Sequence, residues 1–116
     1  MTASTIPNVV PAGLAYYVAA TGTSQYVTVT STNGSISSIY VENLDPTNDV
    51  FVNAVAGTGA VTATAPTAGN PQTGVCVQNG QGRVIQLSAL NQYNAFANVA
   101  VVTFGSTANV VITPVA

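Results

Sequence analysis

The sequence predicts an all-β protein, a single-domain β-sandwich of eight or nine short antiparallel strands. Three observations carry this prediction. Residues of high strand propensity, above all Val and Thr, dominate the chain, whereas Leu, Glu, Lys and Arg are scarce. Alternating strand-like segments recur about every ten residues with turn signals between them, and no segment shows a convincing helical period. The length of 116 residues fits one domain with one modest core.

The candidate strands alternate side chains between two faces. In residues 25–30, for example, Val27 and Val29 alternate with Tyr26, Thr28 and Thr30. Residues 98–104 differ in being apolar on both faces. The segments with strand character are 16–20, 25–30, 36–43, 49–55, 74–78, 83–88, 98–104 and 108–113, with 60–64 as a ninth candidate at a sheet edge.

Turn signals separate these segments and predict local hairpins. Asn33-Gly34 tolerates the positive φ of a tight turn, and Asp45-Pro46 places proline at the second turn position. Gly82 and Gly105 belong to two further turns. We therefore expect three hairpins, which pair 36–43 with 49–55, 74–78 with 83–88, and 98–104 with 108–113.

Two parts of the chain look like contact segments. Residues 1–14 read as an extended N-terminal arm in front of a sandwich domain at 15–116, and they are either a frayed tail or an arm that lies on a neighbouring subunit. The segment 65–72 reads as a long exposed loop. The interface residues expected from these segments, together with the lone cation, are Ile6, Val9, Leu14, Pro66, Pro71 and Arg83.

The scarcity of charge is the most informative feature of the composition. Only 3% of the residues are charged, against about a quarter in an ordinary domain. One arginine cannot neutralise several phosphates, so we expect neither nucleic acid nor an anionic membrane as a partner. Interfaces are poor in Lys, Glu and Asp, so this composition favours a molecule that stays packed against others. A secreted β protein with a neutral surface is the alternative.

The residues needed for catalysis are missing. The chain has no His, one Cys and no Lys, which excludes Ser–His, Cys–His and Schiff-base chemistry and a zinc site of His and Cys. Asp45 and Asp49, with Glu42, offer oxygen ligands for Ca²⁺, but ordinary turn residues that accept backbone N–H bonds are the favoured interpretation. We expect no enzymatic activity, cofactor or metal.

Two single residues add to this picture. Cys76 has no partner for an intramolecular disulfide, and we expect a small half-buried residue in a strand. Arg83 is the only cation, and its planar fork would pair either with a carboxylate of a partner or with Glu42 of its own chain. The N-terminus lacks the charged and apolar regions of a signal peptide, and no apolar run is long enough to cross a membrane.

Three strand–turn–strand segments carry a resemblance to a known class of proteins. They are Ile39–Val52 (IYVENLDPTNDVFV), Gly74–Leu87 (GVCVQNGQGRVIQL) and Asn98–Pro114 (NVAVVTFGSTANVVITP). The sequence resembles small β-sandwich capsid decoration, or cement, proteins of tailed bacteriophages. The resemblance implies a jelly-roll-like fold, oligomers seated at capsid symmetry positions and no enzymatic activity.

The resulting expectation is a viral structural protein that stabilises a capsid from its outer surface after synthesis in the host cytoplasm. Its partners would be the major capsid protein and copies of itself, with a trimer favoured over a dimer. A tail, collar or fibre component is one alternative. A carbohydrate-binding module that uses Tyr16, Tyr17 or Tyr40 is another, although the chain has no Trp.

Overall fold

The computed structural model describes residues 10–57, 59–72, 74–87 and 95–116, and this part of the chain contains strands but no helix. The strands are short because turn-forming Gly, Asn, Pro and Ser residues interrupt the β-branched runs. The strands are β1 (Tyr16–Ala20), β2 (Gln25–Thr30), β3 (Ser38–Asn43), β4 (Val50–Ala56), β5 (Val75–Val77), β6 (Gly82–Gln86), β7 (Phe96–Val102) and β8 (Ala108–Val115).

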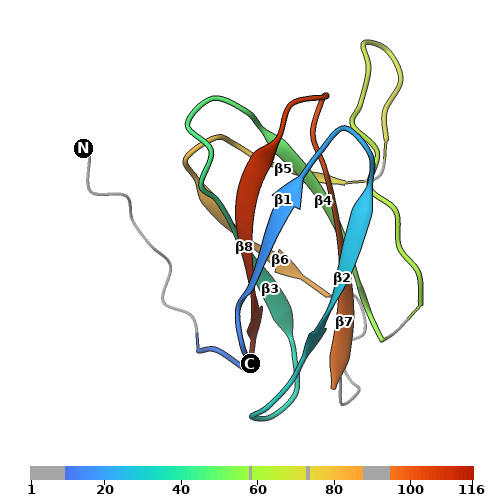
Figure 1. Ribbon diagram of the computed structural model, residues 1–116. Helices are drawn as coiled ribbons and strands as arrows, with labels where there is room; N and C mark the ends of the chain where they lie inside the picture. Colours follow the sequence, from blue (N-terminus) through green and yellow to red (C-terminus); the bar gives the residue numbers. More distant parts are fainter. Residues whose placement is uncertain (1–9, 58, 73, 88–94) are drawn as a thin grey trace.

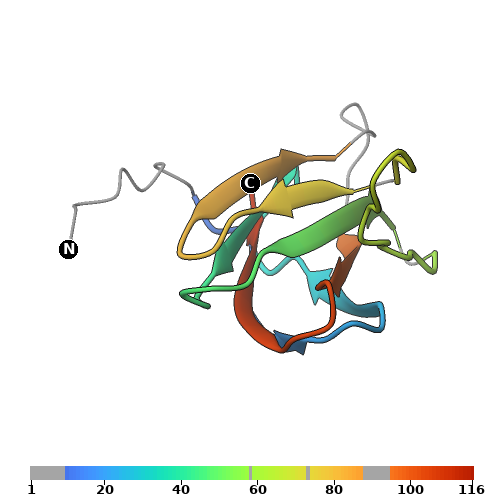
Figure 2. The same ribbon diagram turned by 90° about the horizontal axis from the view of Figure 1, so that it is seen from above.

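The strands form two antiparallel four-stranded sheets packed face to face (Figures 1 and 2). One sheet has the order β1-β8-β3-β6 and the other the order β2-β7-β4-β5. The first strand pairs with the last, β2 with β7, β3 with β6, and β4 with β5, which is the pattern of one long hairpin rolled into two sheets. This is the order of a double-sheet jelly roll, and it confirms the expected single-domain β-sandwich.

The three predicted hairpins are wrong, although the strands themselves lie within a few residues of their predicted bounds. β3 and β4 belong to different sheets, and so do β5 and β6, and β7 and β8. The Asn33-Gly34 turn also joins strands of different sheets, with Gly34 at a φ of 84°. A short turn with suitable residues can cross from one sheet to the other, because turn chemistry fixes a change of direction and not the pairing partner.

The main core is the apolar layer between the sheets. Each strand contributes alternate side chains to it, for example Ile39 and Val41 of β3 and Val99 and Val101 of β7. Almost all its members are Val, Ile or Ala. The β-branched side chains of Val and Ile suit a pleated surface, and the small Ala side chains fill the space between them. The largest side chains buried there include Ile36, Ile39, Leu87, Ile112, Val29, Val41, Val50, Val52, Val77, Val99, Val101 and Val110.

A second apolar cluster lies on the outside of the β2-β7-β4-β5 sheet. The connection between β4 and β5 crosses this outer face, where Val61 and Ala63 cover Phe51, Ala100 and Val102. The connection is the green-to-yellow segment beside β4 in Figures 1 and 2. It explains why β7 is apolar on both faces, since one face meets the core and the other meets the connection.

Side chains of the sheet hold this connection in place. Asn98 is fully buried, and its Nδ2 donates to the carbonyl of Gly59 over 2.5 Å. Asn53 Nδ2 donates to the carbonyl of Thr62 over 3.0 Å. The predicted ninth strand at 60–64 is therefore wrong: the segment lies across a sheet and is bound by side chains, so no strand ladder forms there.

The first described residues are attached to the end of the sandwich. Ala12 is fully buried, its N–H donates to Pro114, and its carbonyl accepts from Thr32 and Asn33. A Cβ on Gly13 would stand 2.2 Å from the carbonyl oxygen of Thr30, so only glycine permits this close approach. Of the predicted arm, Ile6 and Val9 lie outside the described residues, and residues 10–13 contact the domain.

The core between the sheets generates a stability prediction. Ile112→Ala should lower the free energy of unfolding by about 2–5 kcal/mol, because it removes a fully buried side chain and leaves a cavity. Val111→Ala on the adjacent, half-buried outward position should cost under about 1 kcal/mol. Chemical denaturation of both variants measures the difference, and equal losses would contradict the assignment of the two faces.

Candidate functional site

The outer face of the β1-β8-β3-β6 sheet is a broad neutral surface. Register places Tyr17, Val111 and Glu42 in one row across β1, β8 and β3, and Thr113, Tyr40 and Val84 in the next row. Tyr17 is 64% exposed and Val84 40% exposed. The two apolar clusters of the described residues lie between the sheets and under the β4–β5 connection, so neither covers this face.

The aromatic ring of Tyr40 lies flat on this face and is held in place by its neighbours. Its ring lies over Gly82 of β6, where an added Cβ would come within 2.1 Å of the Tyr40 hydroxyl. That hydroxyl donates to Oε2 of Glu42 over 3.4 Å. Burial raises the pKa of Tyr40, and the Glu42 carboxylate raises it further, so the phenol stays neutral and the carboxylate is the only charge in these two rows.

The β6 strand adds an open main-chain edge to the same sheet. Among the described residues it pairs only with β3, and its ladder is bounded by hydrogen bonds from Asn43 N–H to Gln81 and from Leu87 N–H to Ser37. Because antiparallel pairs alternate, Val84 directs its N–H and C=O away from β3, as do its neighbours two residues away on either side. Such an edge is a template for another strand, and β6 lacks the proline or lysine that usually protects one.

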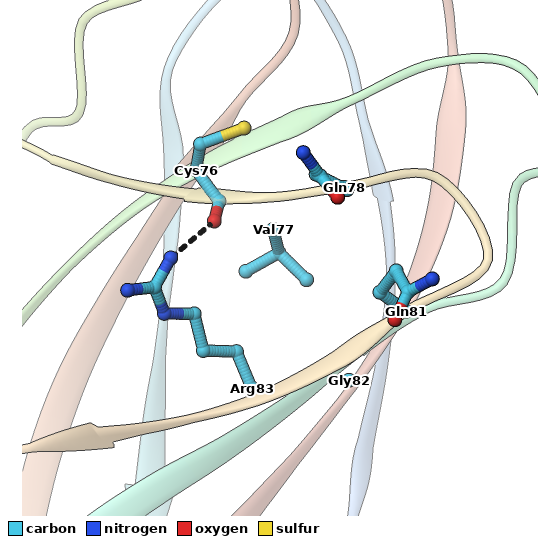
Figure 3. A pocket seen from close by; sticks show the side chains of 6 residues that line it. All are labelled: Cys76, Val77, Gln78, Gln81, Gly82 and Arg83. Atoms are coloured by element: carbon cyan, nitrogen blue, oxygen red, sulfur yellow. Dashed lines mark hydrogen bonds between the residues drawn. The ribbon is translucent and has the colours of Figure 1, made fainter. Parts of the chain in front are cut away.

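Arg83 links the edges of the two sheets. Figure 3 shows its side chain reaching from β6 toward β5, where Nη1 donates to the Cys76 carbonyl over 3.1 Å. The side chain is exposed and lines a shallow pocket with Gln78 and Gln81. Glu42 bonds to Tyr40 on the outer face instead. A role of Arg83 in binding a partner carboxylate stays a prediction.

The other predicted interface residues lie at separate places. Leu14 is 73% exposed and precedes β1. Pro66 is half-buried and Pro71 is exposed, and both belong to the connection that projects from the opposite end of the sandwich. The structure therefore does not bring the described members of the predicted set into one surface, and the candidate face is made of residues that the sequence did not single out as interface residues.

The predicted carbohydrate-contact tyrosines are also dispersed. Tyr16 packs against the core between the sheets, and Tyr40 is 9% exposed. Only Tyr17 offers its ring to solvent. The three residues do not form an aromatic platform, because alternation along β1 sends Tyr16 and Tyr17 to opposite faces.

Asp45 and Asp49 act as turn residues, which confirms the favoured interpretation. Asp45 Oδ2 accepts the backbone N–H of Thr47 over 3.0 Å and of Asn48 over 2.6 Å, and Asp49 Oδ1 accepts the N–H of Asn79 over 3.0 Å. These backbone bonds, chiefly the one from Asn48, lower the pKa of Asp45. In the described part of the chain, no group of three or more Asp, Glu, His or Cys side chains is placed so that it could hold a metal ion.

Buried Asn43 ties this turn to the neighbouring strands. Its Oδ1 accepts the Asp45 N–H over 3.0 Å, and its Nδ2 donates to the carbonyls of Asn48 over 2.8 Å and Val77 over 3.1 Å. These bonds join the end of β3, the turn and β5. The acidic turn is therefore accounted for as a structural corner between the two sheets.

Cys76 is the half-buried strand residue that the sequence predicts. It lies in β5 and packs against the outer cluster beneath the β4–β5 connection. Burial raises the pKa of its thiol, Asp49 raises it further, and Arg83 lowers it by less. A protonated thiol is a poor nucleophile at neutral pH, so its environment fits a packing role.

Comparisons with known proteins do not place the chain in a family. The sequence matches no protein-family model and no curated protein. The described residues also contain no helix long and apolar enough to cross a membrane. The features that bear on function are the fold, the low charge and the sheet face that no described segment covers.

The acidic turn generates a pH-dependent prediction. Asp45→Ala should lower the unfolding temperature at pH 7, because it removes the acceptor of two backbone N–H bonds. The folded pKa of Asp45 lies below the ordinary 3.8, so this stabilisation is present above that value and is lost as the pH falls through the lowered pKa. Thermal unfolding should show the gap between wild type and variant closing in strong acid.

Asp45→Asn is the matched control for this prediction. Asparagine retains one acceptor oxygen but cannot titrate. The stability of this variant should therefore not show the acid-dependent loss that is expected of the wild type. A gap between wild type and Asp45→Ala that stays the same in acid would contradict the assigned role of the Asp45 carboxylate.

Proposed function

We propose that this protein is a viral structural subunit that decorates a capsid and stabilises the shell by protein–protein contacts. The observation that carries the proposal is the nearly uncharged face of the β1-β8-β3-β6 sheet, which no described segment covers, on a protein with one cation and three carboxylates. The jelly roll is a recurrent architecture of viral capsid proteins, which is a likeness of fold and raises this class of function above others.

The chemistry of the face suits permanent contact with a shell. Tyr17, Val84 and Val111 offer apolar surface, and Thr113 adds a neutral polar group that loses little on desolvation. A standard interface covers about 800 Å² per partner, about one eighth of the 6366 Å² surface of this chain. The face spans four strands, and we assign it to the major capsid protein.

Contacts between copies would use other parts of the molecule. We assign them to residues 1–9, including Ile6 and Val9, with Leu14 and the open β6 edge as acceptor surfaces. An arm that lies on a neighbour is a heterologous contact, and a closed ring of such contacts gives a cyclic oligomer. A trimer is the proposed form.

A component of the tail, the collar or a fibre would use the same surfaces. The number of copies per particle distinguishes these locations from the capsid, since decoration requires hundreds of copies per particle.

Shell binding by the neutral face is directly testable. Val84→Arg places a charge in the proposed interface and should weaken binding to assembled capsids at least about tenfold, equivalent to about 1.4 kcal/mol. Thr107→Arg adds the same charge to the exposed loop between β7 and β8 and should bind normally. Co-sedimentation measures occupancy, and undecorated capsids should rupture at lower temperature. Full occupancy by Val84→Arg, or unchanged rupture, would contradict the proposal.

The arm prediction concerns the oligomer in solution. Deleting residues 1–9 should convert the trimer to monomers while the unfolding temperature stays near that of the full chain, because the deletion leaves the buried Ala12 and its hydrogen bonds intact. Light scattering with a thermal melt measures both quantities. A truncated protein that remains trimeric would show that the arm does not hold the copies together.

A further inference from the structure

A second surface lies at the end of the sandwich, away from the proposed shell-binding face. Three segments converge there: the β1–β2 loop, the β4–β5 connection, and the end of β7 with the loop that follows it. They enclose a groove of about 420 Å³, within the range of about 300–1,000 Å³ of small-molecule sites. Ser24 fixes the first two segments together, since its Oγ accepts the Ala63 N–H over 3.1 Å.

Phe104 supplies an aromatic wall to this groove. It is 69% exposed, yet it makes an edge-to-face contact with Phe51, with the ring centroids 4.9 Å apart and an interplanar angle of 73°. Phe51 is itself 7% exposed and belongs to the outer apolar cluster. The contact orients the Phe104 ring while most of its surface stays open to a ligand.

The loop that carries Phe104 is also fixed by hydrogen bonds. The N–H of Thr103 donates to Thr21 over 2.8 Å, and the N–H of Gly105 donates to the Thr103 hydroxyl over 3.1 Å. The Thr103 hydroxyl in turn bonds to the Ser106 carbonyl. The aromatic wall is therefore preorganised, which lowers the entropic cost of binding.

Three threonines of the β4–β5 connection also line the groove. Along the connection, Val61 and Ala63 turn inward and cover the sheet, so Thr62 and Thr64 alternate outward, and exposed Thr67 follows. Every residue that lines the groove is uncharged. The groove thus combines an exposed aromatic ring with neutral hydroxyl donors and acceptors, and it offers no charge to compensate an anionic or cationic ligand.

We propose that this groove binds a neutral carbohydrate. A pyranose ring presents an apolar C–H face to an aromatic ring and hydroxyls around its rim, which matches the Phe104 wall and the threonine wall. The open shape and few anchoring groups fit a weak site, with a Kd on the order of millimolar for a single sugar unit, and many copies on one particle would add avidity. This activity goes beyond shell stabilisation, and only the gain from avidity rests on the proposed decoration role.

Two measurements on the full chain test the proposal. An array of oligosaccharides should show binding to neutral glycans and no preference for sialylated or sulfated ones. Titration of the isotopically labelled protein with glucose, galactose, mannose and N-acetylglucosamine should move NMR signals of Ser24, Thr64 and Phe104 in a saturable way for at least one sugar. No saturable change with any of these probes, or binding confined to anionic glycans, would overturn the proposal.

Variants locate the effect in the groove. Phe104→Ala should weaken the response about tenfold and Thr64→Val about fivefold, the latter through loss of one exposed hydroxyl without a change of shape. Tyr17→Ala, on the shell-binding face, should bind the sugar normally. Thr64→Val removes only an exposed polar group, so it keeps the test valid if Phe104→Ala unfolds. Normal binding by Thr64→Val, or loss by Tyr17→Ala, would overturn the assignment.

The outcome is independent of the proposed capsid role. Phe104→Ala and Thr64→Val should retain normal capsid occupancy, because the groove lies outside the face assigned to the shell. A protein that decorates capsids but binds no sugar would overturn this inference alone, and the reverse result would overturn only the decoration proposal.

Discussion

The apolar layer between the two sheets is the constraint on which the rest of the structure depends. Alternation along each strand sends one set of side chains into this layer, so the opposite set is fixed on the outside once the register is set. A slip of one residue in β8 would expose Ile112 and bury Asn109. The positions of Tyr17, Tyr40 and Val84 on one outer face, and of Phe51 and Asn98 on the other, follow from that single condition.

The outer faces of the two sheets differ in whether a described segment of the chain covers them. Phe51, Ala100 and Val102 make the β2-β7-β4-β5 face apolar, and the chain covers that face with its own β4–β5 connection. Asn53 and Asn98 satisfy carbonyls of the connection that would otherwise lie unpaired near apolar surface. The β1-β8-β3-β6 face has no such cover among the described segments, and this asymmetry is the physical basis for assigning it to a partner.

The same connection links the covered face to the groove at the end of the sandwich. Because Val61 and Ala63 are directed to the sheet, Thr62 and Thr64 must point outward, and the groove gains its hydroxyl wall as a consequence of packing. Phe104 is oriented through Phe51, a member of the same cluster. The β4–β5 connection, the groove and the Phe104 ring therefore form one structural unit, which is separate from the outer face of the β1-β8-β3-β6 sheet.

The sequence by itself determined the all-β class, the approximate bounds of the strands and the neutral surface. These properties are local or compositional: β-branched alternation, turn residues and the lack of charge act without reference to distant parts of the chain. It also predicted Asp45 as a turn residue, because such side chains bond to backbone groups a few residues away. Asp49 accepts a backbone N–H as well, but from Asn79, which only the tertiary structure brings close. The apolar pattern on both faces of β7 was a readable sign that a second segment covers that strand.

Only the tertiary structure decided which strands pair and which residues share a surface. The turns after β3, β5 and β7 suit hairpins locally, but burying both sheets against each other requires these strands to lie in opposite layers. Ser24, Thr64 and Phe104 are far apart in sequence, and Tyr17 and Val84 lie on the two edge strands of one sheet, which β8 and β3 connect. Such long-range placement follows from burial of the shared core, which no short segment of the sequence encodes.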